Sequence, residues 1–589
     1  MTGMDETIRF QRKPRIMYRQ IRKYVAAMTL TEAALSVNEL VIGMIVSNIL
    51  GAEALSIVSA ALPVYGGCCA GIAFFGAGGS LLCGSALGRM KRNEAQRILS
   101  ATMALALLTG ICATVFGMNF RHEISLLLAS GDPVQALVLE KYLFYLLLAA
   151  PVILLISIFS KFLTQAGAPG LASRLLILSN GMSVLFCYLL LAFGGFAAEG
   201  AALGVLLGYM TALAGTAYLI FAGRVPLKFV RFSLSDVRIL WQGVPTGISA
   251  GSTFFWFFAQ VYGMNWLAYQ GAGAAGIAIH GVCLGFNSVL SVIGYGIMDT
   301  MLPMLAVMTG TKDVNAQRFI LRRSYSGVIL IATAISLLVI IFPELLLSVY
   351  GITDAKLCEM GRTAVRFYTI GVCSTVLVFF MQMHLAFLKH NVFVNFLSFF
   401  KSIAIVLPLG GLLVPHYGLT ALWVAYMVSG IISLALCLLF NIRQAHQSKG
   451  SLHGVFLLPE QHQYDLLDFT INCQFSTEIT SLAEYVTECT EKFGLQKKIR
   501  LYIGLAVEEM ALLLQSQNEG KEHTLDVLIY RETHGVRIVF RDLGAPVNLM
   551  EQEDIDGLIS NVRMLRQIST KAIYERMLMM NQHTFYLEN

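Results

Sequence analysis

The sequence predicts an all-α polytopic membrane protein with twelve transmembrane helices in two parallel six-helix repeats, followed by a C-terminal α/β two-layer domain. Three observations support this fold class. Of the 589 residues, 56% are hydrophobic and only 13% are charged, whereas about 25% are charged in typical soluble domains. Similar segments recur 220 residues apart, at Gly51 and Gly271. The apolar runs end near residue 442, and a polar region follows them.

Runs of about 20 or more apolar residues are long enough to cross a bilayer as helices. The longer runs must tilt or extend beyond the membrane. No cleavable signal peptide is expected, because no separate apolar segment with a small-residue cleavage site precedes the first run. The twelve predicted spans are 25–50, 55–84, 98–119, 138–163, 172–194, 200–222, 240–269, 276–308, 319–347, 363–388, 392–414 and 418–441.

Lys and Arg residues gather at one end of these spans. They precede the first span and follow even-numbered spans, whereas the opposite loops are short or acidic. Cytoplasmic loops are enriched in Lys and Arg, so we expect a protein of the cell membrane with both termini cytoplasmic. The net charge of +6 then reflects topology, and nucleic acid is not an expected partner. Examples are Arg12, Lys13, Arg22, Lys23, Arg89, Lys91, Arg92, Arg231, Lys312 and Arg323.

The repeat extends through each half. Gly76 corresponds to Gly296, and both halves reach an Ala-Gln-Arg sequence at the same distance. Because each half has an even number of spans, the halves enter the membrane from the same side. Duplicated bundles place a substrate cavity between them, so transport is the first hypothesis. Glycines spaced four apart predict close helix packing, at Gly67 and Gly71, Gly84 and Gly88, Gly200, Gly204 and Gly208, and Gly243, Gly247 and Gly251.

Neither the cysteines nor the glycine-rich strings indicate a cofactor. The 11 cysteines are scattered and include no CxxC pair, so neither a metal site nor a disulfide framework is expected. The glycine-rich strings lack the strand-to-helix context and the Gly-Lys-Ser/Thr ending of phosphate loops. We therefore expect a transporter without catalytic residues, not an enzyme.

The first span carries a polar stripe. Glu32, Ser36, Glu39 and Gly43 are spaced four, three and four residues apart and share one helical face, and Asn38 adds a neighbouring polar group. A charge inside a bilayer is costly and is usually kept for function, so we expect Glu39 to carry a coupling cation. Glu32 either joins it or extends to the cytoplasmic interface, since it is only about 14 Å of helix from Lys23.

The second half offers a different set of polar residues. Asp299 occupies the place of Gly79 in the first repeat, which indicates either a binding carboxylate or a hydrogen-bonded structural acid. On span seven, Gln260 and Asn265, with nearby Trp and Tyr residues, either face organic cations or belong to the packed core. His280 and His384 lie in apolar surroundings and are expected to be packed, hydrogen-bonded residues.

Several segments resemble the multidrug and toxin extrusion (MATE) family, in order and spacing. They include GAGGSLLCGSALGRMKRNEAQRILS, FLTQAGAPGLASRLLILSNG, GVPTGISAG and GYGIMDTMLPMLAVMTGTKDVNAQRF, and the resemblance covers residues 20–445. It implies a secondary antiporter that exports organic, often cationic, compounds while a proton or sodium ion runs inward. Ile42 and Cys187 stand where many members carry aspartates, and span ten offers Gln382 and His384 in place of an acid. The coupling ion therefore remains open.

The region after residue 442 predicts a linker, 443–464, and a cytoplasmic domain, 465–589. Its expected elements include a helix with the apolar face Ile499, Ile503, Val507, Met510 and Leu514, a later helix near 556–568, and two final strands joined at Asn581-Gln582. IGLAVEEMALLL and VFRDLGAPVNL resemble the histidine-kinase-like ATPase fold, in particular anti-sigma-factor serine kinases. The resemblance implies nucleotide binding through Glu509, Asp542, Gly544 and Gly557. Leu513, however, stands where that family has its Mg²⁺-holding Asn. We therefore expect a degenerate domain that regulates the bundle or binds a cytoplasmic protein, without ATP or Mg²⁺ turnover.

The chain thus divides into five expected parts. A basic N-terminal segment, 1–24, precedes six-helix bundles over 25–223 and 224–442, and the linker and tail follow. The expected partners are a small organic substrate, the lipid bilayer and a cytoplasmic protein. Two alternatives remain. One is a flippase for a lipid-linked precursor, and the other is a membrane receptor that signals through the tail to a sigma-factor-type partner.

Overall fold

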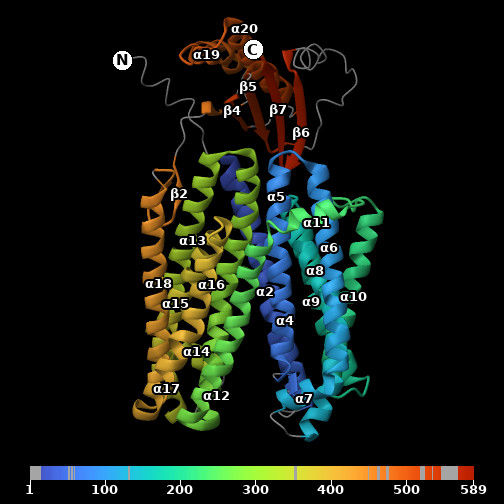
Figure 1. The fold of residues 1–589 in the computed structure, drawn as a ribbon, viewed down its shortest axis with the longest axis vertical. Coiled ribbons are helices and arrows are strands. Elements are labelled where there is room, and N and C mark those ends of the chain that lie inside the picture. The colour runs from blue at the N-terminus through green and yellow to red at the C-terminus, as the bar shows by residue number, and fades with distance from the viewer. Residues whose placement is uncertain are drawn as a thin grey trace.

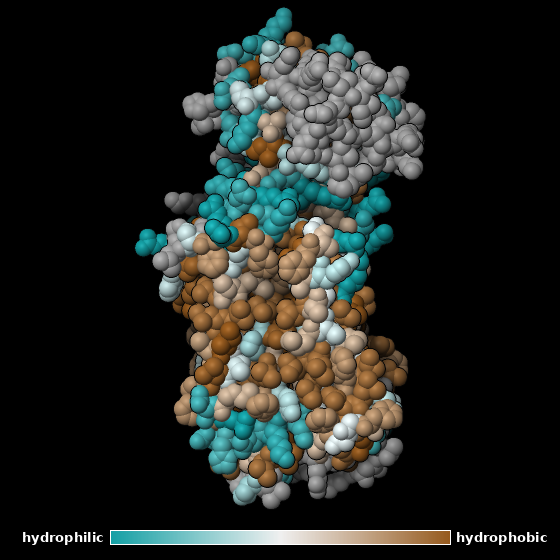
Figure 2. Space-filling view, turned by 90° about the vertical axis from the view of Figure 1, so that its right-hand side faces the viewer, coloured by the Kyte–Doolittle hydropathy of each residue, from teal (hydrophilic) through white to brown (hydrophobic). Residues whose placement is uncertain are grey.

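The computed structural model describes most of the chain, and Figure 1 shows two helical lobes side by side with the tail domain on one end. Figure 2 shows a largely hydrophobic surface across the visible face of the bundle and hydrophilic residues between bundle and tail. We call the end that carries the tail the tail-side end. The described residues are 15–50, 54, 57–58, 60–129, 133–349, 355–448, 450–460, 465–472, 476–517, 524–532, 535–544 and 568–588.

The first lobe consists of the helices of the first repeat. Its long helices pack on one another, and the short helix α7 lies at the end away from the tail. A five-residue π-helical turn, η1, interrupts the second span. The elements are α2 (Arg15–Leu50), α4 (Leu62–Phe75), η1 (Gly76–Ser80), α5 (Leu81–Gly88), α6 (Arg92–Asn119), α7 (Arg121–Leu128), α8 (Pro133–Gln165), α9 (Pro169–Ala192) and α10 (Glu199–Phe221).

The second lobe repeats this plan. A second π-helical turn, η2, lies in the penultimate span. The short helix α11 (Leu234–Leu240) precedes this lobe and packs on α6 of the first lobe. The elements of the second lobe are α12 (Val244–Thr311), α13 (Val314–Ile341), α14 (Pro343–Val349), α15 (Ala355–Phe387), α16 (Asn391–Phe399), η2 (Phe400–Ala404), α17 (Val406–Tyr417) and α18 (Thr420–Gln447).

Helix α12 is two spans joined by a sharp reversal. Ala272 and Gly273 leave the helical conformation, and Gly273 has φ +61°. His280 then lies beside Asn265, with 2.6 Å between its Nδ1 and Asn265 Oδ1, so the two halves run antiparallel. Eleven helices in the described part of the chain are long and apolar enough to cross a membrane. The first half of α12, rich in Gly, Ser and Tyr, is not among them and accounts for the twelfth predicted span.

The first helix starts earlier than predicted, at Arg15, within the segment expected to precede the bundle. Its first turns bury Ile16, Met17 and Tyr24 in the core of the second lobe, and Arg323 lies over the ring of Tyr18. Helix α2 therefore begins against the second lobe and continues into the first. Apolar residues between the basic ones explain why this segment is a buried helix.

The tail is an α/β two-layer domain, as predicted. Its five antiparallel strands have the order β3-β4-β5-β7-β6. Helix α20 buries the predicted apolar face, Ile499, Ile503, Val507, Met510 and Leu514, in one core with the sheet. The helix expected near 556–568 lies almost entirely outside the described residues. The elements are β3 (Asp465–Asn472), α19 (Ser476–Glu491), α20 (Lys497–Gln517), β4 (Thr524–Glu532), β5 (Gly535–Asp542), β6 (Lys571–Met577) and β7 (Met580–Glu588).

Two connections differ from the expectation. The expected linker contains a two-stranded hairpin of β1 (Leu452–His453) and β2 (Leu458–Pro459), and Phe456 stacks on Tyr325 of α13 at 4.4 Å. The final hairpin turns at Leu578 and Met579, which have φ of 50° and 61°. The prediction of a turn at Asn581-Gln582 was wrong. The tip of this hairpin is buried against the bundle, and this tertiary contact selects apolar turn residues.

Candidate functional site

Glycines bring the two lobes into backbone contact at their tail-side end. A Cβ added to Gly78 would lie 2.9 Å from Gly243 O, and one added to Gly247 would lie 2.7 Å from Phe74 O. A Cβ on Gly310 would lie 2.5 Å from Ser85 O. The predicted glycine spacing therefore packs α4, η1 and α5 against α12, across the seam between the lobes. This contact closes the tail-side end of the seam.

Gly310→Val should disrupt this closure. The added side chain would meet the backbone of Ser85 and Gly88, which cannot rotate away, and overpacking of this kind costs roughly 1–3 kcal/mol. We expect a lower melting temperature of the purified protein. Gly281→Val is the matched control, because it lies on the same helix with nothing within 4 Å of its added Cβ. Equal melting temperatures for both variants would contradict tight packing at Gly310.

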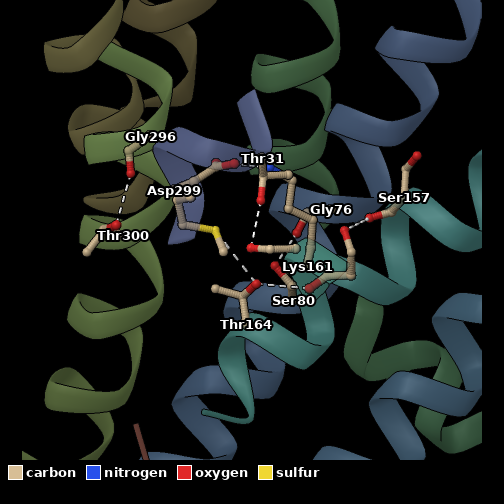
Figure 3. A network of polar contacts seen from close by, with 12 residues as sticks. Thr31, Gly76, Ser80, Ser157, Lys161, Thr164, Gly296, Asp299 and Thr300 are labelled. Atoms are coloured by element: carbon tan, nitrogen blue, oxygen red, sulfur yellow. Dashed lines mark hydrogen bonds and ion pairs between the residues drawn. The ribbon is translucent and has the colours of Figure 1, made fainter. Parts of the chain in front are cut away.

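Three ionisable side chains meet at the same seam. Lys161 of α8, in the first lobe, forms an ion pair with Asp299 of α12, in the second. Glu32 of α2 lies close enough to both Asp299 and Lys161 to interact electrostatically with them. Figure 3 shows the Lys161 and Asp299 side chains pointing toward each other from opposite lobes. The predicted residues Glu32 and Asp299 are thus brought together.

Hydroxyl groups hold the first-lobe side of this cluster in place. Thr31 donates to Ser173 Oγ at 2.7 Å, and Ser173 also lies 3.0 Å from the carbonyl oxygen of Ala27. Thr164 lies within 3.9 Å of the Met28 sulfur. These contacts tie residues 27–31 of α2, immediately before Glu32, to α8 and α9 (Figure 3). The position of Glu32 is therefore fixed by its neighbours.

The charges of the cluster do not balance by themselves. Glu32 and Asp299 bring two carboxyl groups to one lysine. With both carboxyls ionised, Lys161 neutralises only one of them, and like charges in close contact repel. A cation at this point therefore favours contact between the lobes, and its loss favours separation.

Two further residues were predicted on the first span, Glu39 and Asn38. The Glu39 side chain is outside the described residues, so its role stays a prediction. Asn38 lies six residues beyond Glu32, about 9 Å along the helix. Its Oδ1 is buried and has no hydrogen-bond partner within the described structure. The described contacts do not bring Asn38 to the Lys161 and Asp299 pair.

The polar residues predicted on span seven lie inside the second lobe. Gln260 is buried, and Asn265 is hydrogen-bonded to His280. Tyr262 and Trp266 are exposed, with 76% and 57% of their area accessible. The burial of Gln260 and the contact of Asn265 with His280 favour the packed-core alternative for these two residues, and their role in substrate binding stays a prediction. Lys161 was not among the predicted site residues, although a lysine within the apolar run ISIFSKFL indicates a charge inside the span.

The tail contacts both lobes. Asp313 begins α13 by accepting a hydrogen bond from Ala316 N, and it forms an ion pair with Arg541 of β5 in which both side chains are completely buried. On the other lobe, the turn between α8 and α9 approaches the final hairpin so closely that a Cβ added to Gly167 would lie 2.9 Å from Leu578 N. The tail therefore spans the seam at its closed end.

Glu575 of β6 is an acid whose ionisation should affect stability. Burial raises its pKa to about 7, opposed by the positive charge of Arg92. Because the folded protein prefers the protonated form, the stability this group contributes is complete below about pH 4.5 and is lost as pH rises through about 7. We expect the melting temperature to fall between about pH 4.5 and 7, and Glu575→Gln to reduce that fall. An identical fall in this variant would assign the pH dependence to other groups.

The nucleotide-site residues suggested for the tail are only partly described. Asp542 accepts hydrogen bonds from Gly544 N at 2.6 Å and Asn581 Nδ2 at 3.0 Å. Burial, and then the charge of Glu508, raises the pKa of Glu509. Leu513 lies in the apolar core between helix and sheet, where it offers no oxygen to Mg²⁺. Gly557 lies outside the described residues.

Comparison with known proteins supports the fold of the membrane part. The MatE family model matches residues 27–189, and no curated protein matches the chain. A MOP superfamily transporter from Pyrococcus furiosus, described as having a binding pocket of reverse polarity that suggests a different function, is 17% identical with a TM-score of 0.65. A multidrug resistance MATE family transporter in an outward-facing conformation is 18% identical with a TM-score of 0.66. Each comparison covers 73% of this chain and 96% of the other.

These similarities agree with the repeat, the helices and their order. The chain is a multi-pass membrane protein whose membrane part has the MATE fold. A MATE structure in a bent conformation is similar as well, at 19% identity and a TM-score of 0.63. At such identities the likeness establishes the fold, and the roles of individual residues must be argued from their own surroundings.

Proposed function

We propose that this protein is a secondary antiporter that exports organic compounds, with cationic compounds among them, while a proton or sodium ion moves inward. The observation that carries the proposal is the meeting of Glu32, Asp299 and Lys161 between the lobes. Its surplus carboxyl is a cation site whose occupancy favours contact between the lobes. The MATE fold and the match of residues 27–189 to the MatE family support the proposal.

The cluster would couple ion and substrate as follows. A ligand shifts a conformational equilibrium only by binding one state better than the other. A cation at Glu32 and Asp299 stabilises the state in which the tail-side end is closed. Once the tail-side end opens, departure of that cation into the cytoplasm leaves two carboxylates beside one lysine, which keeps this end open. Binding of a substrate in place of the cation would then return the lobes to the closed state, where a cation from the outside replaces the substrate.

Purified protein in vesicles tests this function. The vesicles would carry an imposed proton gradient in one series and an imposed sodium gradient in another, with ethidium as a cationic probe and carboxyfluorescein as an anionic one. We expect one gradient to drive movement of a probe against its own concentration difference, and an ionophore for that ion to stop it. Absence of gradient-driven movement for both probes would favour the flippase or receptor alternatives.

The proposal gives the tail a regulatory role. Its contacts with Asp313 and Gly167 join the two lobes at the end that Lys and Arg residues mark as cytoplasmic. The apolar surroundings of Leu513 support a role without nucleotide hydrolysis. Full-length protein should therefore show no Mg²⁺-dependent phosphate release above that of Glu509→Ala. Turnover that this substitution removes would support the kinase-like receptor alternative.

A further inference from the structure

A second charged side chain lies in the middle of the second lobe. Lys401 belongs to η2 in the span from Asn391 to Tyr417. Ten residues separate it from Asn391, or about 15 Å of helix, which is half the thickness of a bilayer core. An ammonium group at this depth is costly and is rarely kept without a function or a partner of opposite charge.

The surroundings of Lys401 are polar but neutral. Its Nζ donates a hydrogen bond to Gln382 Oε1 at 3.1 Å and lies 5.8 Å from the ring centre of Phe379. The Gln382 amide is completely buried and donates in turn to Ser398 Oγ at 2.9 Å. Whereas Lys161 has Asp299, the interactions of Lys401 within the described structure include no carboxylate. This charge is oriented by its neighbours but is not neutralised by them.

The backbone holds Lys401 in this position. A π-helical turn contains one residue more than an α-helical turn and shifts the residues that follow, and such turns occur often at functional sites. The turn leaves the Lys401 carbonyl oxygen available, and Ser429 of α18 donates to it at 2.6 Å. Both ends of the residue are therefore fixed, the backbone by α18 and the side chain by α15.

An aromatic pair connects Lys401 with the seam between the lobes. Phe379 packs edge to face with Tyr295, with 5.0 Å between ring centres. Tyr295 lies one turn before Asp299 on α12, close enough to interact with Glu32 and with Cys69 of the first lobe. Phe379, Tyr295 and Lys401 are each only partly buried. One side of the aromatic pair thus carries an unneutralised cation, and the other faces the carboxyl cluster.

We propose that Lys401 is an anion-binding subsite, and that the transported compound is an aromatic or other apolar carboxylate. Its carboxylate would pair with the Lys401 ammonium, and its apolar body would lie against Phe379 and Tyr295. A compound that also carries a cationic group would place that group at Glu32 and Asp299, as the proposed exchange with the coupling cation requires. This proposal rests on the proposed transport function, because it names the class of substrate that the protein takes.

Binding to the purified full-length protein in detergent tests the subsite without any ion gradient. The probes are naphthalene-2-carboxylate, its neutral carboxamide and a naphthyl trimethylammonium ion, which share one aromatic body and differ in charge. Quenching of tryptophan fluorescence reports binding. We expect the carboxylate to bind at least tenfold more tightly than the carboxamide. Lys401→Gln should reduce this preference to about onefold and leave carboxamide binding unchanged.

Two further variants keep the result interpretable. Lys401→Arg retains the charge and should keep part of the preference, and Lys141→Gln, an exposed lysine on α8, should leave it intact. The proposal is overturned if folded Lys401→Gln keeps the carboxylate preference, or if the wild-type protein prefers the trimethylammonium probe. The transport and binding assays can also disagree. If the wild-type protein shows no gradient-driven transport but keeps a carboxylate preference that depends on Lys401, the proposed antiport is refuted and the anion-binding subsite is supported.

Discussion

Glu32→Gln and Asp299→Asn should each abolish ion-driven transport while leaving a folded protein. Asp299 pairs with Lys161 across the seam, and Glu32 adds the surplus carboxyl that a cation must neutralise. With Gln at position 32, the Lys161 and Asp299 pair is neutral without any bound cation. The lobes then close whether or not the ion is present, so the ion no longer determines the state.

The two variants separate coupling from binding. In vesicles, gradient-driven probe accumulation should fall to the level of protein-free vesicles. Exchange of labelled for unlabelled probe, which needs no net ion movement, should persist in Glu32→Gln. Glu344→Gln is the matched control, since Glu344 forms an exposed ion pair with Arg362, and such pairs contribute only about 0–1 kcal/mol. Normal accumulation by both seam variants would exclude this cluster as the coupling site.

The same assay tests the expectation that Glu39 carries the coupling cation. Glu39 shares the helical face of Glu32, seven residues further along α2. If Glu39→Gln abolishes accumulation and Glu32→Gln does not, the sequence-based prediction holds and the seam cluster is structural. If both abolish it, the cation moves between two carboxyls about 10 Å apart along the helix.

Local patterns explain what the sequence predicted. Apolar runs and the 220-residue repeat are continuous signals, and they indicated the spans and the two lobes. The apolar face of α20 likewise indicated the two-layer tail. Glu32 and Asp299 were found because a carboxylate in an apolar run is conspicuous without any knowledge of its neighbours.

Long-range contacts explain what it did not predict. Lys161 and Asp299 are 138 residues apart, and no local pattern joins them. The ion pair of Asp313 and Arg541 joins residues 228 apart. The turn at Leu578 and Met579 lacks Gly, Asn or Asp, so turn propensity favoured the wrong residues. In each case the decisive partner comes from another lobe or domain.

Arg541→Met should release the tail from the membrane part. The Asp313 and Arg541 side chains are both completely buried, and removing one partner of such a pair leaves an unpaired charge at a cost of about 3–5 kcal/mol. That cost corresponds to a decrease of roughly a hundredfold or more in the ratio of docked to released tail. With the bridge between the lobes weakened, probe exchange in vesicles should become faster.

Accessibility of the hairpin tip measures this release. Leu578 is completely buried, so in L578C a maleimide should label position 578 only when the tail lifts. Peptide mapping separates this label from those on native cysteines.

A double variant tests whether the ion pair itself holds the tail. Asp313→Asn should also increase labelling, whereas the double variant with Arg541→Met lacks both charges of the pair and should label more slowly than either single variant. Glu94→Gln, which breaks the exposed pair with Arg89, should leave labelling unchanged. Asn caps the N-terminus of a helix as well as Asp does, so Asp313→Asn should leave the start of α13 intact. Increased labelling in this variant therefore reports the lost ion pair. Additive effects of the two substitutions would show that the pair does not hold the tail in place.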